Sequence, residues 1–281
     1  MRYLVASLLV LINSLSFAQN INQSNIMLEK MYQKGAVNER LFDEESVLMI
    51  DYQPTIIGAF AIKSYIDSLL THNTFSDIRF KSLETYLYKD VVIDIGNLDW
   101  ERNNNRERGK YWNVWKLIEK DVYVLQSHSF GFYHKAISPE LLRFQIETDS
   151  FNTPIQDNFE LMAYNALMEK AVKKRDGVLR AEFFTEDASF FPFEETPKIT
   201  KKVLLPYLIQ YNSGDVTIKE INVFTIDYEK LEDGFIEYNG FNVNWQAGNF
   251  QGKTTGKGIR IWKRQADGSL KIFREIGLHD L

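Results

Sequence analysis

Gly-Lys-Tyr-Trp-Asn-Val-Trp-Lys, at residues 109–116, returns later in the chain as Gly-Lys-Gly-Ile-Arg-Ile-Trp-Lys, at residues 256–263. The Gly-Lys pair, a branched aliphatic residue and the Trp-Lys pair match position for position, and Trp262 follows Trp115 by 147 residues. This separation is about one domain length. The sequence therefore predicts one fold made twice, which can hold two ligand sites or one site and one structural copy.

The repeat extends to both sides of this stretch. Residues 41–47 (LFDEESV) resemble residues 183–189 (FFTEDAS), and residues 62–66 resemble residues 204–208. In each copy, segments that alternate as strands do then lead into a long hairpin. Each half therefore runs from helices into an antiparallel sheet, which predicts an α+β fold.

Helical spacing is found near the start of each half. Ser24 or Asn25 is placed to cap a first helix, and a second helix is expected from Asn158 to Lys174. Gly35 and Gly177 are expected to end these two helices. The apolar side of the second helix is predicted to consist of Leu161, Ala163, Leu167, Met168 and Ala171.

The two hairpins have their arms at residues 91–100 and 110–119, and at residues 235–245 and 257–265. Residues 102–110 and 248–254 are then expected to be solvated tips. The second tip imitates a phosphate-binding loop, but it has three residues between its glycines where four are needed, and it joins two strands. A tight turn at residues 266–268 leads to a last strand, residues 269–276.

Composition bounds the class of protein. The 281 residues suffice for two domains, and 44% hydrophobic and 25% charged residues are near globular averages. A net charge of −5 argues against a general nucleic-acid-binding role. The chain has no cysteine, which excludes disulfides, thiolate catalysis and zinc–cysteine sites.

The N-terminus has the three regions of a secretory signal peptide. Arg2 supplies positive charge, Leu4–Leu15 is an apolar stretch, and Ser16-Phe17-Ala18 places small residues at a cleavage site. We expect cleavage between Ala18 and Gln19, which predicts a secreted or periplasmic protein. The apolar stretch is shorter than the ~20 residues of a membrane span, so no membrane span is expected.

At this point the chain resembles the nuclear-transport-factor-2-like (NTF2-like) superfamily, which includes ketosteroid isomerases and SnoaL-type polyketide cyclases. The residues that carry the resemblance are Phe183–Ala188, the sheet beginning at Gly256-Lys257, and the hairpin Ile261–Ile272. The resemblance implies two tandem cone-shaped domains, each with N-terminal helices packed on a curved antiparallel sheet around a cavity. It also implies pairing through the outer faces of the sheets, so that the two copies form a pseudo-dimer; a homo-oligomer is an open alternative.

The predicted domains are a signal peptide at 1–18, a first NTF2-like domain at 25–136, a connector at 137–157 and a second NTF2-like domain at 158–281. Strand alternation predicts which residues face the cavities. In the last strand, Leu270, Ile272, Arg274 and Ile276 share the more apolar face, which we expect to point inward. Arg274 then binds an anionic ligand or pairs with a carboxylate such as Glu194 or Glu195.

The same alternation places Trp112, Val114, Ile259 and Ile261 inside, and Trp115, Trp262, Asn113 and Arg260 outside. The two outward tryptophans would form a seam between the copies or cap their own sheet edges. The predicted ligand-binding residues are Arg274, Tyr238, Ile259, Trp112, Ser127, which aligns with Arg274, and Asp94.

Candidates for proton-transfer chemistry are Asp94, Tyr86, Tyr238 and Asp227, but none falls in a motif of the family's catalytic positions, so the catalytic residues stay unknown. His128 aligns with Glu275 on the predicted outer face, and His279 lies where the chain end is expected to fray. We expect no metal and no cofactor.

The leading hypothesis is a protein that binds a small, apolar or amphipathic molecule in a domain cavity without catalysis. An isomerase, cyclase or dehydratase acting by proton transfer, and a protein–protein interaction module, are the alternatives.

Overall fold

The computed structural model describes residues 23–35, 41–119, 122–148 and 158–280. The predicted signal peptide and its cleavage site, residues 120–121 and connector residues 149–157 lie outside the described residues. Residues 57–129 form the body of one compact unit, and residues 158–280 form the body of the other. The predicted domain boundaries stay a prediction.

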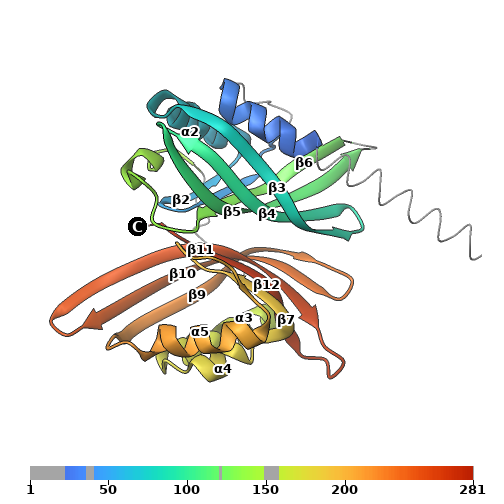
Figure 1. Cartoon of the computed structure of the whole chain (residues 1–281). Helices are drawn as coiled ribbons and strands as arrows, with labels where there is room; N and C mark the ends of the chain where they lie inside the picture. Colours follow the sequence, from blue (N-terminus) through green and yellow to red (C-terminus); the bar gives the residue numbers. More distant parts are fainter. Residues whose placement is uncertain (1–22, 36–40, 120–121, 149–157, 281) are drawn as a thin grey trace, which may run out of the picture. The chain divides into compact units, whose positions relative to one another are not determined.

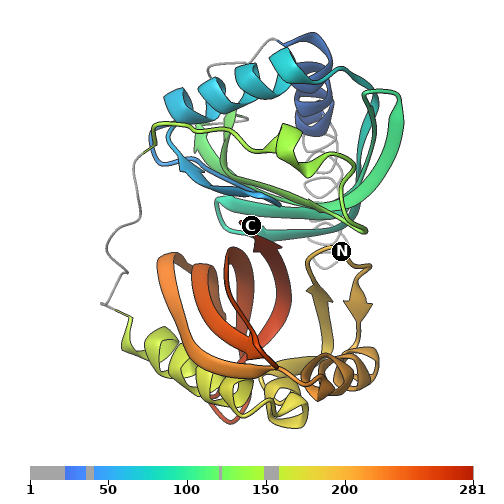
Figure 2. The same ribbon diagram turned by 90° about the vertical axis from the view of Figure 1, so that its left-hand side faces the viewer.

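The first copy folds as a six-stranded sheet with helices (Figures 1 and 2). The strand order is β2-β1-β6-β5-β4-β3, and the helix at residues 23–34 precedes these strands. The elements are β1 (Val47–Ile50), β2 (Gln53–Ile57), α2 (Ala59–His72), β3 (Phe75–Tyr88), β4 (Val91–Arg102), β5 (Asn105–Glu119), β6 (Val122–Phe132) and the 3₁₀ helix η1 (Pro139–Leu142).

The second copy has the same order of strands, β8-β7-β12-β11-β10-β9. Helices α3, α4 and α5 lie along one face of this sheet, and Figure 2 shows its strands curving above α3. The elements are α3 (Phe159–Lys173), α4 (Gly177–Ala181), β7 (Phe184–Phe191), β8 (Lys198–Ile199), α5 (Lys201–Ser213), β9 (Thr217–Lys230), β10 (Gly234–Ala247), β11 (Phe250–Arg264) and β12 (Leu270–His279). The predicted α+β class and its duplication are confirmed, although β12 and β7 pair in parallel rather than antiparallel.

The two sheets bend at equivalent places. The register between β3 and β4 shifts between Ser82 and Glu84, and the register between β9 and β10 shifts where Thr225 and Asp227 flank one extra residue. Such β-bulges bend a strand and increase its twist. The repeated bulges explain how each long sheet curves around its helices.

Both ends of α3 agree with the sequence to within one residue, but the residue that turns the chain after the helix is not the predicted one. Asn158 caps the helix, since its Oδ1 accepts a hydrogen bond from the Leu161 backbone N at 3.1 Å. Gly35 ends the first helix with φ of 67°, as predicted, but Arg175, with φ of 56°, makes the turn after α3. Gly177 instead begins α4, and a Cβ there would lie 2.5 Å from the Leu208 carbonyl oxygen, so its role is close packing against α5.

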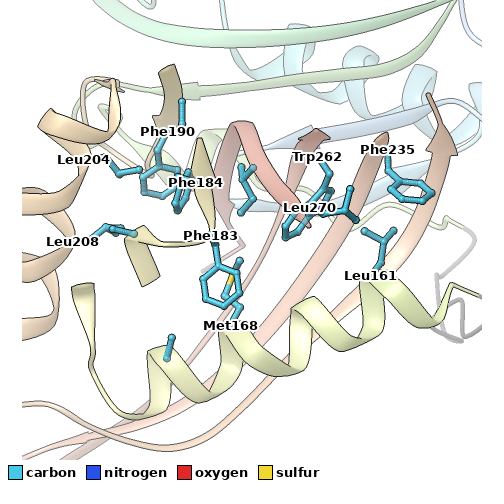
Figure 3. Packing of buried hydrophobic residues seen from close by; sticks show 14 residues of the cluster. Leu161, Met168, Phe183, Phe184, Phe190, Leu204, Leu208, Phe235, Trp262 and Leu270 are labelled. Carbon is cyan, nitrogen blue, oxygen red and sulfur yellow. The ribbon is translucent and has the colours of Figure 1, made fainter. Parts of the chain in front are cut away.

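The core of the second unit lies between the helices and the sheet. Figure 3 shows Leu161 of α3 pointing toward Phe235 and Trp262 of the strands, whereas Met168 lies beside Phe183. Two members of the predicted apolar side do not belong to it. Ala163 is exposed and Leu167 is 47% exposed, so they lie on the outer side of α3.

The hairpins are longer than predicted. The first turns at Asn103-Asn104, both with positive φ, as a tight two-residue hairpin turn requires. Arg102 is therefore not on a solvated tip. It is buried and forms a two-point ion pair with Glu107, with nitrogen–oxygen distances of 2.8 and 2.9 Å.

The last strand also runs further than expected. It continues to His279, whose ring stacks on Phe193 at a centroid distance of 4.2 Å, so the predicted fraying at this residue is wrong. Among the described residues, no helix is long and apolar enough to cross a membrane.

Candidate functional site

A buried cluster of polar side chains lies between α3 and the second sheet. Each member comes from a different element, and we call the group the Arg260 cluster. Its members are Asn165 on α3, Thr225 on β9, Glu237 on β10, Arg260 on β11 and Glu275 on β12, none more than 5% exposed.

Glu237 accepts most of the hydrogen bonds in this cluster. Its Oε1 accepts from Asn165 Nδ2 at 2.8 Å and from Thr225 Oγ1 at 2.7 Å, while its Oε2 accepts from Trp262 Nε1 at 2.8 Å. A buried carboxylate is tolerated only when such donors compensate for its lost hydration. These bonds therefore fix α3 on the sheet and hold the Trp262 ring in the core.

Arg260 lies between the two carboxylates. Its Nε donates to Glu275 Oε1 at 2.7 Å, and its terminal nitrogen donates to Asn165 Oδ1 at 2.9 Å and lies 3.5 Å from Glu237 Oε2. Burial alone would lower the pKa of Arg260, but the charges of Glu275 and Glu237 outweigh it and raise the pKa above its usual value. The guanidinium therefore stays charged.

The second oxygen of Glu275 differs from the other polar atoms of the cluster. Glu275 Oε2 is buried and has no hydrogen-bond donor within the part of the chain that the structure describes. A buried carboxylate oxygen without a donor is costly. It is thus the place in the cluster where a donor from a bound molecule would be most favourable.

The first unit contains a second buried cluster, between its first helix and its sheet, which we call the Asp94 cluster. None of its members is more than 2% exposed, except for Ser82, which is exposed. They are Asn25 and Tyr32 on the first helix, Ser82 on β3, Asp94 on β4, Tyr111 and Asn113 on β5, and His128 on β6.

Asp94 is the acceptor at one end of this cluster. Its Oδ2 accepts from Asn25 Nδ2 and from Tyr111 OH, both at 2.8 Å, and its Oδ1 accepts from Thr85 Oγ1 at 3.3 Å. Buried donors and a buried carboxylate satisfy one another here, so the first helix is fixed to the sheet.

His128 is the acceptor and donor at the other end. Its Nδ1 lies 2.7 Å from Asn113 Oδ1, and its Nε2 lies 3.0 Å from Tyr32 OH. Because the Asn113 oxygen can only accept, this geometry fits a neutral imidazole with its proton on Nδ1. Burial lowers the pKa of His128 to about 3.

The two clusters occupy equivalent positions. Asp94 pairs across the sheet with Asn113, as Glu237 pairs with Arg260. The equivalent pairs, first copy before second, are Asn25 and Asn165, Ser82 and Thr225, Asp94 and Glu237, Asn113 and Arg260, and His128 and Glu275. The same set of hydrogen-bonding positions thus carries mostly neutral groups in the first copy and an Arg–Glu ion pair in the second.

The side chain of Glu237 is one methylene group longer than that of Asp94, its equivalent in the first copy. Glu237 reaches the indole nitrogen of Trp262, whereas the shorter Asp94 has no such bond to Trp115. Trp115 Nε1 is buried with no acceptor among the residues that the structure describes. The second copy therefore carries the more completely bonded tryptophan.

A further repeat, which the sequence analysis did not use, lies on the helix of each cluster. Asn25 and Glu29 recur as Asn165 and Glu169, four residues apart and each followed by Lys. Both glutamates accept a backbone hydrogen bond from the third strand of their copy, at 2.9 Å for Glu29 and 2.6 Å for Glu169. Asn25, expected to cap the first helix, lies instead within it.

The pKa of His128 leads to a prediction for stability against pH. Above pH 6.5, the pKa of His128 in the unfolded chain, the imidazole is neutral in both the folded and the unfolded protein. Below this pH the imidazole of the unfolded chain binds a proton, whereas the buried imidazole of the folded chain stays neutral down to about pH 3. Stability should fall by about 1.4 kcal/mol per pH unit between about pH 6.5 and 3 from this group alone. Urea titrations at neutral pH and near pH 4.5 should show that His128→Gln loses about 2–3 kcal/mol less than the natural chain. An identical pH dependence of the two proteins would contradict the neutral, buried imidazole.

The inward and outward faces of the central strands are the reverse of those predicted. Asn113 and Arg260 bond to helix residues, and Trp262 packs on Tyr164 of α3 at a centroid distance of 5.4 Å. Trp112 and Ile259 therefore point away from the helices. The predicted seam of outward tryptophans is wrong for Trp262, and His128 faces inward rather than outward.

A β-bulge moves Arg274 to the opposite face from Ile272. Ile261 pairs with Arg274 and the next residue, Trp262, pairs with Ile272, so Phe273 is an extra residue on β12. Leu270 and Ile272 face the core as predicted, but Arg274 does not. Its guanidinium donates to the Asp187 carbonyl at 2.8 Å and lies over the Phe273 ring.

Of the six predicted ligand-binding residues, only Asp94 lies in a helix-facing cluster. Tyr238 and Ser127 alternate with Glu237 and His128 and so lie on the other faces of their strands. Burial, together with the charges of Glu229 and Asp227, raises the pKa of Tyr238. Tyr86 donates to Glu84, outside the clusters. The described residues contain no group of three or more His, Cys, Asp or Glu that could hold a metal ion.

A groove opens on the second sheet away from the clusters. It has a volume of about 570 Å³ and is lined by Lys219, Glu220, Asn244, Trp245, Gln246, Gln251, Gly252 and Lys253. Trp245 is held by a hydrogen bond from its Nε1 to Thr254 Oγ1 at 3.0 Å. The groove is open and polar, unlike the enclosed apolar sites typical of small molecules.

No family model and no curated protein matches the sequence. Among solved structures, the chain is similar to a ketosteroid isomerase-like protein from Erwinia carotovora atroseptica, with 11% identity, a TM-score of 0.39, and 44% of this chain and 98% of that chain covered. It is similar to ActVI-ORFA from Streptomyces coelicolor, with 16% identity, a TM-score of 0.38, and coverage of 43% and 95%.

A third similar structure is an NTF2-like protein from Cytophaga hutchinsonii, with 15% identity, a TM-score of 0.36, and coverage of 44% and 99%. At these identities the likeness concerns the fold alone. Each of these comparisons covers less than half of this chain and nearly the whole of the other protein.

Proposed function

We propose that this protein is secreted or periplasmic and binds a small amphipathic molecule in its second unit without catalysis. The observation that carries the binding proposal is the buried Glu275 Oε2, an acceptor without a donor beside the charged Arg260. A hydroxyl or amine of a ligand would supply that donor. A hydrogen bond to a charged group contributes about 1.5–3 kcal/mol. The order of regions in residues 1–18 supports the location.

The apolar surroundings of the cluster favour a ligand with an apolar body. Phe184, Phe190 and Trp262 lie in the same core between helices and sheet (Figure 3). Phe190 pairs directly with Glu275 in the sheet. A molecule that reached Glu275 would therefore bury its apolar part against aromatic rings while its polar end met the carboxylate.

The protonation states in the first unit argue against acid–base catalysis there. A general acid or base works best when its pKa is near the working pH. Burial lowers the pKa of His128 to about 3 and raises the pKa values of Tyr32 and Tyr111 far above neutrality. The hydrogen bonds of Asp94 also engage both of its oxygens. These groups support a structural role.

We expect native mass spectrometry to detect the ligand on the mature chain, from Gln19, purified gently from its own host. The natural chain should carry an extra mass that disappears on denaturation. Glu275→Gln, which turns an acceptor into a donor, should lose that mass or bind at least about tenfold more weakly, equivalent to about 1.4 kcal/mol.

His128→Gln, at the equivalent position of the first unit, is the matched control and should keep the extra mass. Circular dichroism would establish that both variants are folded. A clean mass for the natural chain would argue against bound ligand, and loss of the mass in His128→Gln alone would move the site to the first unit.

One observation favours proton-transfer catalysis as a second candidate. Glu237 and Glu275 contact the same guanidinium but have different surroundings, and carboxylates in unlike environments can divide the roles of acid and base. Once the ligand is identified, its conversion by the natural chain but not by Glu237→Gln would support an enzyme. Binding without conversion would support the leading proposal.

A further inference from the structure

The outward side of α3, α4 and α5 exposes several large apolar side chains to solvent. These three helices lie side by side over one face of the second sheet (Figure 1), and we call their outward side the helical face. Its exposed apolar side chains include Phe159 at 78%, Leu167 at 47%, Val178 at 54%, Val203 at 48% and Ile209 at 46%. Large exposed apolar patches mark sites of interaction.

The helical face is also basic in an acidic protein. Residues 159–181 and 201–213 carry seven Lys or Arg and three Asp or Glu, hence a net charge of +4, whereas the whole chain has −5. Lys170, Lys173, Lys174 and Lys202 are exposed. Within the part of the chain that the structure describes, these four lysines form no ion pair, whereas Lys201 lies 3.1 Å from Glu182.

The three acidic side chains in these segments are all engaged elsewhere. Glu160 pairs with Arg264 at 2.8 Å, Glu169 accepts from the Val223 backbone N at 2.6 Å, and Asp176 caps α4 by accepting from the Leu179 backbone N at 2.8 Å. Within the described residues, none of these three carboxylates forms an ion pair with the four exposed lysines. The face presents ammonium groups and apolar side chains together.

We propose that the helical face docks on the surface of a membrane that contains anionic phospholipids. The lysines would contact the headgroups, and the apolar side chains between them would enter the boundary with the acyl chains. Lysine stems can lie along apolar surface while their ammonium groups remain at the headgroups. This combination, spread over three helices, fits a lipid surface better than it fits a purely acidic polypeptide, which would match the lysines but leave the apolar side chains exposed.

Co-sedimentation with vesicles tests this proposal on the mature full chain. One set of vesicles contains phosphatidylcholine with about one third phosphatidylglycerol, and the other contains phosphatidylcholine alone. At about 0.1 M salt we expect binding to the anionic vesicles at least tenfold stronger than to the neutral ones, and its loss at about 0.5 M salt. Equal binding to both vesicles, or none to the anionic ones, would overturn the proposal.

Two triple variants locate the contact. Lys170→Glu, Lys173→Glu and Lys174→Glu together should reduce anionic vesicle binding at least tenfold. The control, Lys81→Glu, Lys89→Glu and Lys135→Glu, changes three other exposed lysines and the net charge by the same amount, and should bind as the natural chain does. An equal loss in both variants would show a net-charge effect and overturn the assignment to the helical face.

The apolar part of the contact needs its own variant. Phe159→Ser with Leu167→Ser keeps every charge, and it should weaken vesicle binding severalfold while leaving the far-UV spectrum unchanged. Binding unaffected by this double change would contradict insertion of the apolar side chains. Lysine-dependent capture of soluble polyglutamate without any vesicle binding would likewise overturn the proposal and assign the face to an acidic protein partner.

Discussion

Replacing Arg260 by methionine should lower the free energy of unfolding by about 3–5 kcal/mol, because it leaves Glu237 and Glu275 buried without their shared cation. Methionine has a similar length and no charge, so the change removes the ion pair while keeping most of the volume. Urea denaturation followed by circular dichroism would measure the loss.

The equivalent change in the first copy is the matched control. Asn113→Met removes a neutral amide that bonds to His128, so it should cost about 1–3 kcal/mol, the penalty for an unsatisfied buried polar group. Equal losses in the two variants would contradict the view that charge makes the Arg260 cluster the more demanding of the two. Adding Glu275→Leu to Arg260→Met should recover part of the stability, since it removes one of the stranded carboxylates.

Replacing Asp94 by alanine should cost about 3 kcal/mol, the second largest effect expected. The change removes the acceptor for Asn25, Tyr111 and Thr85, and it leaves the buried donors of Asn25 and Tyr111 only their longer bonds with each other and with Ser82. It also leaves a small cavity under the first helix. The same denaturation experiment measures this loss.

Asp99→Ala is the control for this second prediction. Asp99 lies on the same strand but is 28% exposed and pairs with Arg106, itself 49% exposed. Exposed ion pairs contribute about 0–1 kcal/mol. If Asp94→Ala cost no more than Asp99→Ala, the Asp94 cluster would not hold the first helix on its sheet.

The two clusters show how one set of hydrogen-bonding positions accepts different chemistry. In each copy an asparagine on the helix bonds to a carboxylate on one strand and to a side chain on the next strand, which is Asn113 or Arg260. That side chain also bonds to a residue on the last strand of the sheet, which is His128 or Glu275. The first copy closes the chain of bonds with neutral His128, whereas the second closes it with the ion pair of Arg260 and Glu275. The copies therefore share the mode of helix docking and differ in the charge placed inside.

Local pattern was sufficient for the elements of the fold. Alternation, turn residues and the Asn158 cap predicted α3 and the last strand to within a few residues, and the hairpin arms except near their tips, because these features depend on neighbours along the chain. The repeat around Trp115 and Trp262 predicted the duplication. Alternation also showed correctly that Asn113 and Trp115, or Arg260 and Trp262, share a face.

Which face points inward could not be decided from alternation. The apolar residues Ile259 and Trp112 suggested the wrong side, because both faces of these strands are buried. The inward polar residues are tolerated only through partners far along the chain, as when Arg260 bonds Asn165, 95 residues away. The extra residue in β12 then displaced Arg274, since a bulge interrupts the two-residue period on which the prediction depended.

The sequence by itself thus determined the class of fold, its duplication and the long hairpin that follows the helices in each half, since each of these depends on short-range periodicity and on turn and cap residues. The two short strands between the helices of each copy were not predicted. Only the tertiary structure decided which polar groups meet in the interior and which carboxylate oxygen is left without a donor. Hydrogen bonds between distant segments form only once helix and sheet are packed together, and their geometry leaves no trace in local spacing.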